Sequence, residues 1–373
     1  MLRRTFGCVR LVYNKALHEK SEAWATAKKS IGYVAQNREL TAWKKTPELA
    51  FLNEVSSVTL QQSLRHLHRA YANFFARRAR YPRFKKKHSG GSATFSRGAF
   101  RFDGTTLYLA KMATPIEVRW SRSLPIGVEP SSVTVSLDAA GRWHVSMLCD
   151  DKSVRTLPVL EAAVGVDLGV NHLATLSTGE KIDNPRHDGR ERRRKKLLSQ
   201  SLARKQKGSR NRDKARLKLA RLHARVADRR RDHLHKLTTR LVRENQAIVV
   251  EDLSVAGMVR NHRIARVISD AGWRMLLSQL AYKCEWYGRD MIKVDRFFPS
   301  SKTCSVCGRV VEHLPLDVRR WLCPGCNADH DRDENAARNI LAAGHAVAAC
   351  GPGVSHRLLR QAVRLGLKQE PRP

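Results

Sequence analysis

Two closely spaced pairs of cysteines restrict the fold of this chain more than any other feature of its sequence. Each pair has the spacing C-x-x-C, and 15 residues separate the two pairs. Four thiolates at this spacing coordinate one Zn²⁺ ion tetrahedrally and leave no open coordination position, whereas a redox dithiol needs only one pair. We therefore expect a structural zinc ribbon that folds a segment too small to have its own core. The predicted ligands are Cys304, Cys307, Cys323 and Cys326.

The other cysteines and the apolar residues favour a protein of the reducing cytoplasm. Cys8, Cys149, Cys284 and Cys350 are scattered singly, which is not the pattern of a disulfide framework. No stretch approaches the roughly 18 apolar residues that a membrane span needs. No apolar run follows the N-terminal arginines, as it would in a signal peptide. We expect a cytoplasmic protein that has no membrane partner.

The charge of the chain indicates a polyanionic partner. Its 70 Lys and Arg residues and 34 Asp and Glu residues give a net charge of +36, and a surface this positive repels itself unless a polyanion neutralises it. Half of that charge lies in residues 186–243, where 23 basic and 5 acidic residues leave a net charge of +18. A charge run is often only a solvated face, but this excess is too large for internal ion pairs. We therefore predict contact with the phosphates of nucleic acid.

The N-terminal part of the chain divides into a helical region and a strand-rich region. Residues 1–80 are predicted to be helical, and the clearest apolar run at helical spacing is Leu60, Leu64, Leu67, Tyr71, Phe74 and Phe75. The arginines between these residues allow two interpretations of the helix. Its basic face is either exposed to solvent or lies against phosphates. Residues 81–158 contain short alternating segments separated by turns, which favours a small β-barrel or sandwich. The predicted strands are residues 99–102, 106–109, 116–120, 132–137 and 143–149.

The second half of the chain has the element order of a ribonuclease H-like domain. The predicted elements are strands at 163–169, 173–177 and 181–182, a basic helical hairpin at 186–243, a strand at 247–251, a helix at 273–284 and a strand at 291–294. The first three strands are expected to form an antiparallel meander, and Gly208 is expected to split the hairpin. The predicted fold class is α+β and multidomain. N-terminal helices and a small β-barrel precede a ribonuclease H-like (RuvC) α/β domain with an inserted zinc ribbon.

Three acidic residues lie where strands or helices begin or end. Asp167 interrupts an apolar strand, Glu251 ends another strand, and Asp333 lies where the last helix opens. Singly, each acid has a structural explanation, as a turn residue, a strand-end cap or a helix N-cap, and Asp331 is an equal candidate for the N-cap. Together they are the oxygen ligands that Mg²⁺ prefers, and two such ions about 4 Å apart can hydrolyse phosphodiesters. We expect the three side chains to converge within a few ångströms and to bind catalytic Mg²⁺.

At these segments the sequence resembles the TnpB family, which bacterial insertion sequences encode and which looks like a compact relative of the type V CRISPR effector nucleases. The matching segments are residues 7–14, 164–169, 248–253, 298–304 and 331–340. The resemblance implies a RuvC-type nuclease in which Asp167, Glu251 and Asp333 are the first, second and third acids. It also implies that an RNA from the transposon end guides the protein to complementary double-stranded DNA. The protein itself would then read backbone shape and a short motif beside the target.

The resemblance also implies a division into domains and a location with the bacterial nucleoid. Family members typically have a strand and a short helix ahead of the motif at residues 7–14, so we expect a misassigned start codon or a shortened copy. The expected domains are a helical REC-like region at 1–80, a WED-like β-barrel at 81–158, the RuvC domain at 159–298 and 327–345, the zinc ribbon at 299–326 and a basic tail at 346–373.

Three functions are compatible with these features. The first is an RNA-guided, Mg²⁺-dependent DNA endonuclease encoded by a transposable element. The second is a zinc-ribbon protein that binds nucleic acid or regulates transposition without cutting, in which the acids are structural caps. The third is a transposase that uses the same acids to join DNA strands. Cleavage assays with guide RNA and assays for joined transposon ends distinguish the three.

Overall fold

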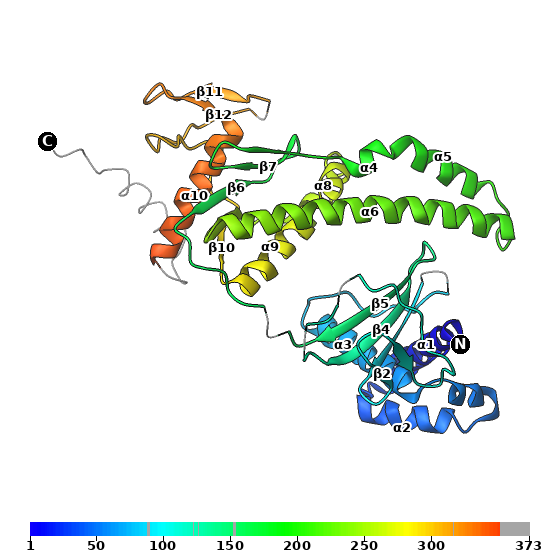
Figure 1. Cartoon of the computed structure of the whole chain (residues 1–373). Coiled ribbons are helices and arrows are strands. Elements are labelled where there is room, and N and C mark those ends of the chain that lie inside the picture. Colours follow the sequence, from blue (N-terminus) through cyan, green and yellow to red (C-terminus); the bar gives the residue numbers. More distant parts are fainter. Residues whose placement is uncertain (88–89, 122, 126, 152–153, 316, 351–373) are drawn as a thin grey trace. The chain divides into compact units, whose positions relative to one another are not determined.

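The computed structural model describes residues 1–373 except 88–89, 122, 126, 152–153, 316 and 351–373. The chain divides into two compact units (Figure 1). The first unit contains Met1–Ser153 and Arg204–Arg221, and the second contains Val154–Ala203 and the chain from Leu222 onward. Each unit has its own hydrophobic core.

The first unit begins with the predicted helices. They are α1 (Leu2–Ala27), α2 (Tyr33–Trp43), the 3₁₀ helix η1 (Pro47–Glu54) and α3 (Ser57–Phe75). The predicted apolar stripe of α3 is confirmed over most of its length, because Leu60, Leu64, Leu67 and Tyr71 are buried against α1 and the strands. The stripe ends before Phe75, whose side chain is 73% exposed.

The strand-rich region forms two small sheets, and the predicted closed barrel is not present among the described residues. β1 (Gly91–Ser96), β4 (Pro130–Leu137) and β5 (Trp143–Cys149) form an antiparallel sheet in the order β1-β4-β5. β2 (Phe100–Phe102) and β3 (Leu107–Leu109) form a separate antiparallel pair. The strand predicted at 116–120 is wrong, since only Ile116 forms an isolated bridge there, to Leu107. A barrel closes only when its end strands pair, and here β1 and β5 each pair with β4 alone.

The second unit is built on a five-stranded mixed sheet in the order β10-β9-β6-β7-β8. β6 (Ala163–Asp167), β7 (His172–Leu176) and β8 (Lys181–Asp183) form the predicted antiparallel meander. β9 (Ala247–Glu251) pairs in parallel with β6, and β10 (Asp290–Val294) pairs in parallel with β9. The predicted meander and the strands that follow it are thus confirmed.

Helices cover the two faces of this sheet differently. Successive side chains of a strand point to opposite faces, so Val164, Val166, Ile248 and Val250 share one face, where they pack with α6 (Arg210–Glu244) and α9 (Trp273–Tyr287). Val249 points to the other face and packs against Ile340 and Ala343 of α10 (Arg332–Cys350).

The contact between α10 and the sheet requires glycine. A Cβ added at Gly165 of β6 would lie 2.1 Å from the backbone oxygen of Ala337, and one added at Gly344 would lie 2.4 Å from Val249 Cγ1. Only a residue without a side chain lets backbones approach this closely. The glycines therefore fix the distance at which α10 crosses the central strands.

The remaining elements of the chain are helices and a β-hairpin. The predicted break at Gly208, where φ is 87°, is confirmed. Within the described part of the chain, no helix combines the length and apolar character needed to cross a membrane. Of the basic tail expected at 346–373, the last residues of α10 are described and residues 351–373 lie outside the described residues. The elements not yet named are α4 (His187–Arg190), α5 (Arg192–Ala203), α7 (Val255–Met258), α8 (Ala265–Ala271), β11 (Arg320–Leu322) and β12 (Asp329–Asp331).

Replacing Gly165 tests the close packing of α10. We expect Gly165→Ala to lower the free energy of unfolding by about 1–3 kcal/mol. The added methyl group would collide with the backbone of α10, which has no room to move away. Gly7→Ala is the matched control: an added Cβ there meets no atom within 4 Å, and alanine favours helix α1. Chemical denaturation measures both variants. Equal stability of Gly165→Ala and the unsubstituted chain would contradict the packing described.

Candidate metal centres

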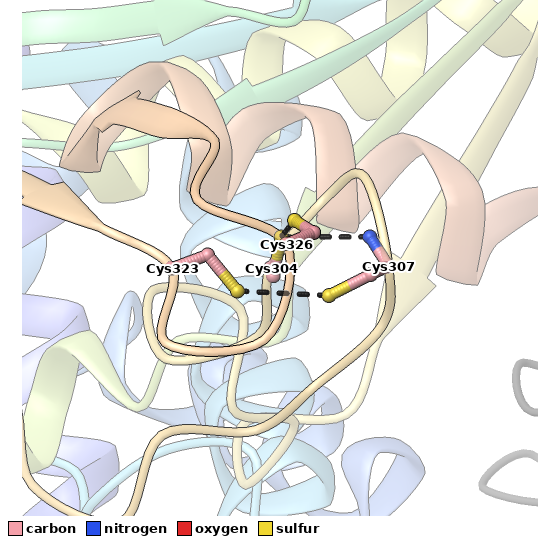
Figure 2. Close-up of side chains that lie close together, drawn as sticks. All are labelled: Cys304, Cys307, Cys323 and Cys326. Atoms are coloured by element: carbon pink, nitrogen blue, oxygen red, sulfur yellow. Dashed lines mark hydrogen bonds between the residues drawn. The ribbon is translucent and has the colours of Figure 1, made fainter.

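The two cysteine pairs lie together in the folded chain (Figure 2). The Sγ atoms of Cys304 and Cys326 are 3.7 Å apart, and those of Cys307 and Cys323 are 3.6 Å apart. All four sulfur atoms lie within 4.8 Å of one another. Four thiolates are a ligand set that suits tetrahedral Zn²⁺. The predicted grouping of the cysteines is confirmed, and the cluster can hold a zinc ion.

The backbone around the cysteines is shaped for thiolate ligands. Gly308 and Asn327, which follow the two pairs, have φ angles of 74° and 57°, so each loop turns sharply after its second cysteine. The backbone N–H groups of Cys307 and Gly325 point to the sulfurs of Cys304 and Cys323, with N–S distances of 3.5 and 3.4 Å. Such N–H donors favour the deprotonated thiol, which is the form that binds metal.

His330 is a residue beside the cluster that sequence reasoning did not identify. It lies on β12, which pairs with β11 in an antiparallel hairpin, and its Nε2 atom is 3.0 Å from Cys304 Sγ. The ring is buried and packs on Trp321, with 4.7 Å between ring centroids. Burial lowers the pKa of His330, which keeps the ring neutral with one N–H to donate. The alternation Asp329-His330-Asp331 was the available signal, since it turns only the histidine inward.

The three candidate acids belong to elements that meet at one edge of the sheet. Asp167 and Glu251 are the last residues of β6 and β9, which are parallel neighbours with Val166 opposite Val250. Each acid lies two residues after a residue that faces α10, so the pleat turns both carboxylates to the α10 face. Asp333 lies in the first turn of α10. The structure therefore brings the three predicted acids to the same face and the same end of the sheet.

Burial and the neighbouring acids both change the pKa of Asp167. Burial, followed by the charges of Glu251 and Asp333, raises the pKa of Asp167 to about 7, although Arg332 and Arg319 oppose the shift. Burial also raises the pKa of Glu251. Like charges held together in a site of low polarity keep protons or bind a cation. Pairs of carboxylates with such shifted pKa values are typical of functional sites.

Ser300 is a second residue that the sequence did not single out. Its Oγ donates a hydrogen bond to Glu251 Oε1 at 2.5 Å, which partly offsets the effect of burial on the pKa of Glu251. Ser300 is itself buried, and its carbonyl accepts a hydrogen bond from Asn339 Nδ2 of α10 at 2.8 Å. Ser300 therefore orients the carboxylate of Glu251 from a segment that α10 holds in place.

The neighbouring acids have structural partners. Asp331 Oδ1 accepts hydrogen bonds from the backbone N–H groups of Asp333 and Glu334, at 3.2 and 3.1 Å, so Asp331 is the N-cap of α10. Its other oxygen pairs with Lys181 at 2.5 Å. Asp252 pairs with Arg296 at 2.9 Å. The cap explanation that was open for Asp331 and Asp333 therefore applies to Asp331.

The convergence of the acids is looser than that of the cysteines. Among the described residues, the four cysteines are the one group of three or more histidine, cysteine, aspartate or glutamate ligands whose atoms all lie within 4.8 Å of one another. Asp167, Glu251 and Asp333 do not form such a group. Asp333 Oδ1 is instead 3.3 Å from Arg319 Nη1, a cation that neutralises part of its charge.

Removing one cysteine tests the zinc ribbon. We expect the purified chain to contain one zinc per molecule, and Cys323→Ser to lose it and unfold at a lower temperature, because the segment has no large core of its own. Cys149→Ser is the control, since Cys149 lies outside the cluster on β5. Elemental analysis and thermal unfolding give the two readouts. Full zinc content in Cys323→Ser would contradict the assignment.

Sequence families match three parts of the chain. A family described as "Probable transposase" matches residues 145–262, one described as "Cas12f1-like, TNB domain" matches residues 273–340, and one described as "Helix-turn-helix domain" matches residues 1–29. The second match begins at Trp273 and ends at Ile340, so it contains the four cysteines of the ribbon and Asp333.

Relatives extend the match over the whole chain. A "Putative RNA-guided DNA endonuclease" of Streptomyces pristinaespiralis is 57% identical over 99% of this chain and 92% of its own length. The "Putative RNA-guided DNA endonuclease InsQ" of Escherichia coli is 35% identical over 96% of this chain and 92% of its own. The cryo-EM structure of a Cas12f1–sgRNA–target DNA complex has a chain with a similar fold, with a TM-score of 0.57 at 14% identity over 91% of this chain and 81% of that one. The chain belongs to the TnpB family of transposon-encoded proteins, as its sequence motifs predicted.

Proposed function

We propose that this protein is an RNA-guided, Mg²⁺-dependent DNA endonuclease, in which Asp167, Glu251 and Asp333 are the catalytic acids. The observation that carries the proposal is the register of β6 and β9. It turns Asp167 and Glu251 to the same face of the sheet, toward the helix whose first turn contains Asp333. The names of the relatives support the reaction and its guide.

The three carboxylates suit divalent magnesium. They are hard oxygen ligands, and the pKa of Asp167 is raised first by burial and then by the charges of Glu251 and Asp333, so a bound cation would stabilise its charged form. Two ions about 4 Å apart need ligands spread more widely than the thiolates of a single zinc ion. Bound Mg²⁺ would polarise the scissile phosphate and lower the pKa of an attacking water.

The residues of the chain have separate tasks in this proposal. The hydrogen bond that Ser300 donates fixes the orientation of the Glu251 carboxylate. Arg319, which pairs with Asp333, lies where it can also contact a phosphate oxygen. The four cysteines have no part in bond breaking, because a complete thiolate set leaves no position for substrate. The remaining basic surface would hold guide RNA and target DNA through their backbones.

Asp167→Asn separates a catalytic acid from a structural one. We expect the variant to lose guide-dependent cleavage by at least about a thousandfold, since a metal ligand is gone, while its affinity for nucleic acid stays unchanged. We also expect it to unfold at a higher temperature at pH 8 without divalent metal, because the buried like charge is removed.

Asp252→Asn is the control for this experiment, because Asp252 is adjacent to Glu251 but is paired with Arg296. It should retain cleavage. Cleavage by Asp167→Asn at the normal rate would overturn the assignment of the first acid. Guide binding without cleavage by the unsubstituted chain would instead favour a protein that holds nucleic acid and does not cut it.

The raised pKa of Asp167 predicts a pH dependence of metal binding. Below pH 7 this carboxyl is protonated and a metal must displace the proton, so the concentration of Mn²⁺ that half-saturates the site should fall as the pH rises from 6 to 8. Arg319→Gln should move this dependence to higher pH, because Arg319 lowers the pKa of Asp167. Calorimetric titration with Mn²⁺ measures both. A half-saturating concentration that is constant over this range would contradict the pKa.

A further inference from the structure

Exposed aromatic residues lie at the end of α3 and in the segment that follows it, outside both candidate metal centres. Phe75, Tyr81 and Phe84 have exposed fractions of 73%, 46% and 56%. We call these three residues, with Arg77, Arg78, Arg80 and Arg83 between them, the aromatic–basic surface. Large apolar side chains are normally buried, and several exposed together on one short segment mark an interaction site.

Two rings of this surface, Phe75 and Tyr81, contact other side chains. Phe75 stacks on the buried Tyr71 with 6.2 Å between ring centroids, and it contacts Phe74 at 5.3 Å. Tyr81 contacts Phe74 edge to face at 5.3 Å. The Tyr81 hydroxyl is hydrogen bonded to those of Ser21 and Tyr71, at 2.8 and 2.9 Å. A ring that is already ordered loses little conformational entropy when a ligand stacks on it.

The segment that carries the rings has charges of one sign. Residues 74–87 contain seven Lys and Arg residues and no Asp or Glu. Arg77, Arg78, Arg80 and Arg83 are exposed, and none of them forms a salt bridge within the described residues. Arginines without acidic partners beside flat apolar rings are complementary to a ligand that has both phosphates and planar bases.

We propose that the aromatic–basic surface binds a single-stranded stretch of the guide RNA by stacking its unpaired bases on Phe75 and Tyr81. The proposal rests on the proposed function for the presence of the guide. Bases of duplex DNA already stack on each other and are not free to stack on a side chain. Unpaired RNA bases commonly stack on aromatic rings while arginines contact the adjacent phosphates.

The test compares Phe75→Ala and Phe75→Trp in the full chain. The probe is a short unstructured RNA oligonucleotide, and a second probe has the same backbone without bases. We expect Phe75→Ala to bind the first probe about tenfold more weakly, which is the loss of one stacked base, and Phe75→Trp to bind it as tightly as the unsubstituted chain. The abasic probe should bind all three proteins equally.

The salt dependence of binding separates stacking from charge. Phe75→Ala should leave the slope of log affinity against log salt unchanged, whereas Arg78→Gln should reduce it by about 0.7, the value for one phosphate contact with a single strand. Trp24→Ala is the matched control, because Trp24 is 57% exposed on α1 and lies outside the ring cluster.

Three outcomes are decisive. Equal weakening of the abasic and normal probes by Phe75→Ala would overturn the stacking proposal, and so would an equal effect of Trp24→Ala. Tighter binding of single-stranded DNA than of RNA would overturn the choice of RNA. Failure of the unsubstituted chain to bind any polynucleotide would instead contradict the proposed function, so the two failures are distinguishable.

Discussion

The direct contact between the backbones of α10 and β6 is the constraint on which the candidate site depends. Asp333 can approach Asp167 and Glu251 only if α10 crosses the sheet at backbone distance, and Gly165 is the residue that permits it. The hydrophobic residues on this face are few, with Val249, Ile340 and Ala343 buried at its centre. A small apolar interface thus holds three like charges together, and their repulsion opposes the fold that brings them there.

The zinc ribbon and the acids form one connected structure. Asn335 of α10 donates a hydrogen bond to the carbonyl of Thr303 at 2.7 Å and accepts one from the N–H of Ser305 at 2.9 Å, on either side of the ligand Cys304. Three residues before Thr303, Ser300 bonds to Glu251. Both asparagines of this helix are buried, and Asn339 Nδ2 donates hydrogen bonds to the carbonyls of Ser300 and Thr303. A short chain of hydrogen bonds therefore connects the metal-binding loop to the edge of the sheet.

Much of this arrangement could be predicted from the sequence. Apolar residues repeat about every two residues in a half-buried strand and about every 3.6 residues in an amphipathic helix, and this repeat reveals which face of the element is buried. The cysteine spacing predicted the thiolate cluster, and the apolar strands predicted the mixed sheet. The prediction of a β-barrel was wrong because the sequence pattern of a strand does not show whether the two end strands of a sheet pair with each other. Ser300 and His330 were missed because their importance arises from contacts between distant segments. The distances between the three acidic side chains depend on how their charges are balanced, and the positions of the acids along the sequence do not reveal this balance.

The N-cap at Asp331 also limits how members of this family can vary. The cap fixes where α10 begins, and Asp333 follows it by two residues. An inserted or deleted residue between them would rotate the third acid by about 100° around the helix axis. A change in the length of the loop between Gly308 and the first strand of the hairpin leaves the two-residue spacing of Asp331 and Asp333 intact. Length differences among homologous ribbons should therefore accumulate before the second cysteine pair, and the segment from the hairpin to the helix should keep a constant length.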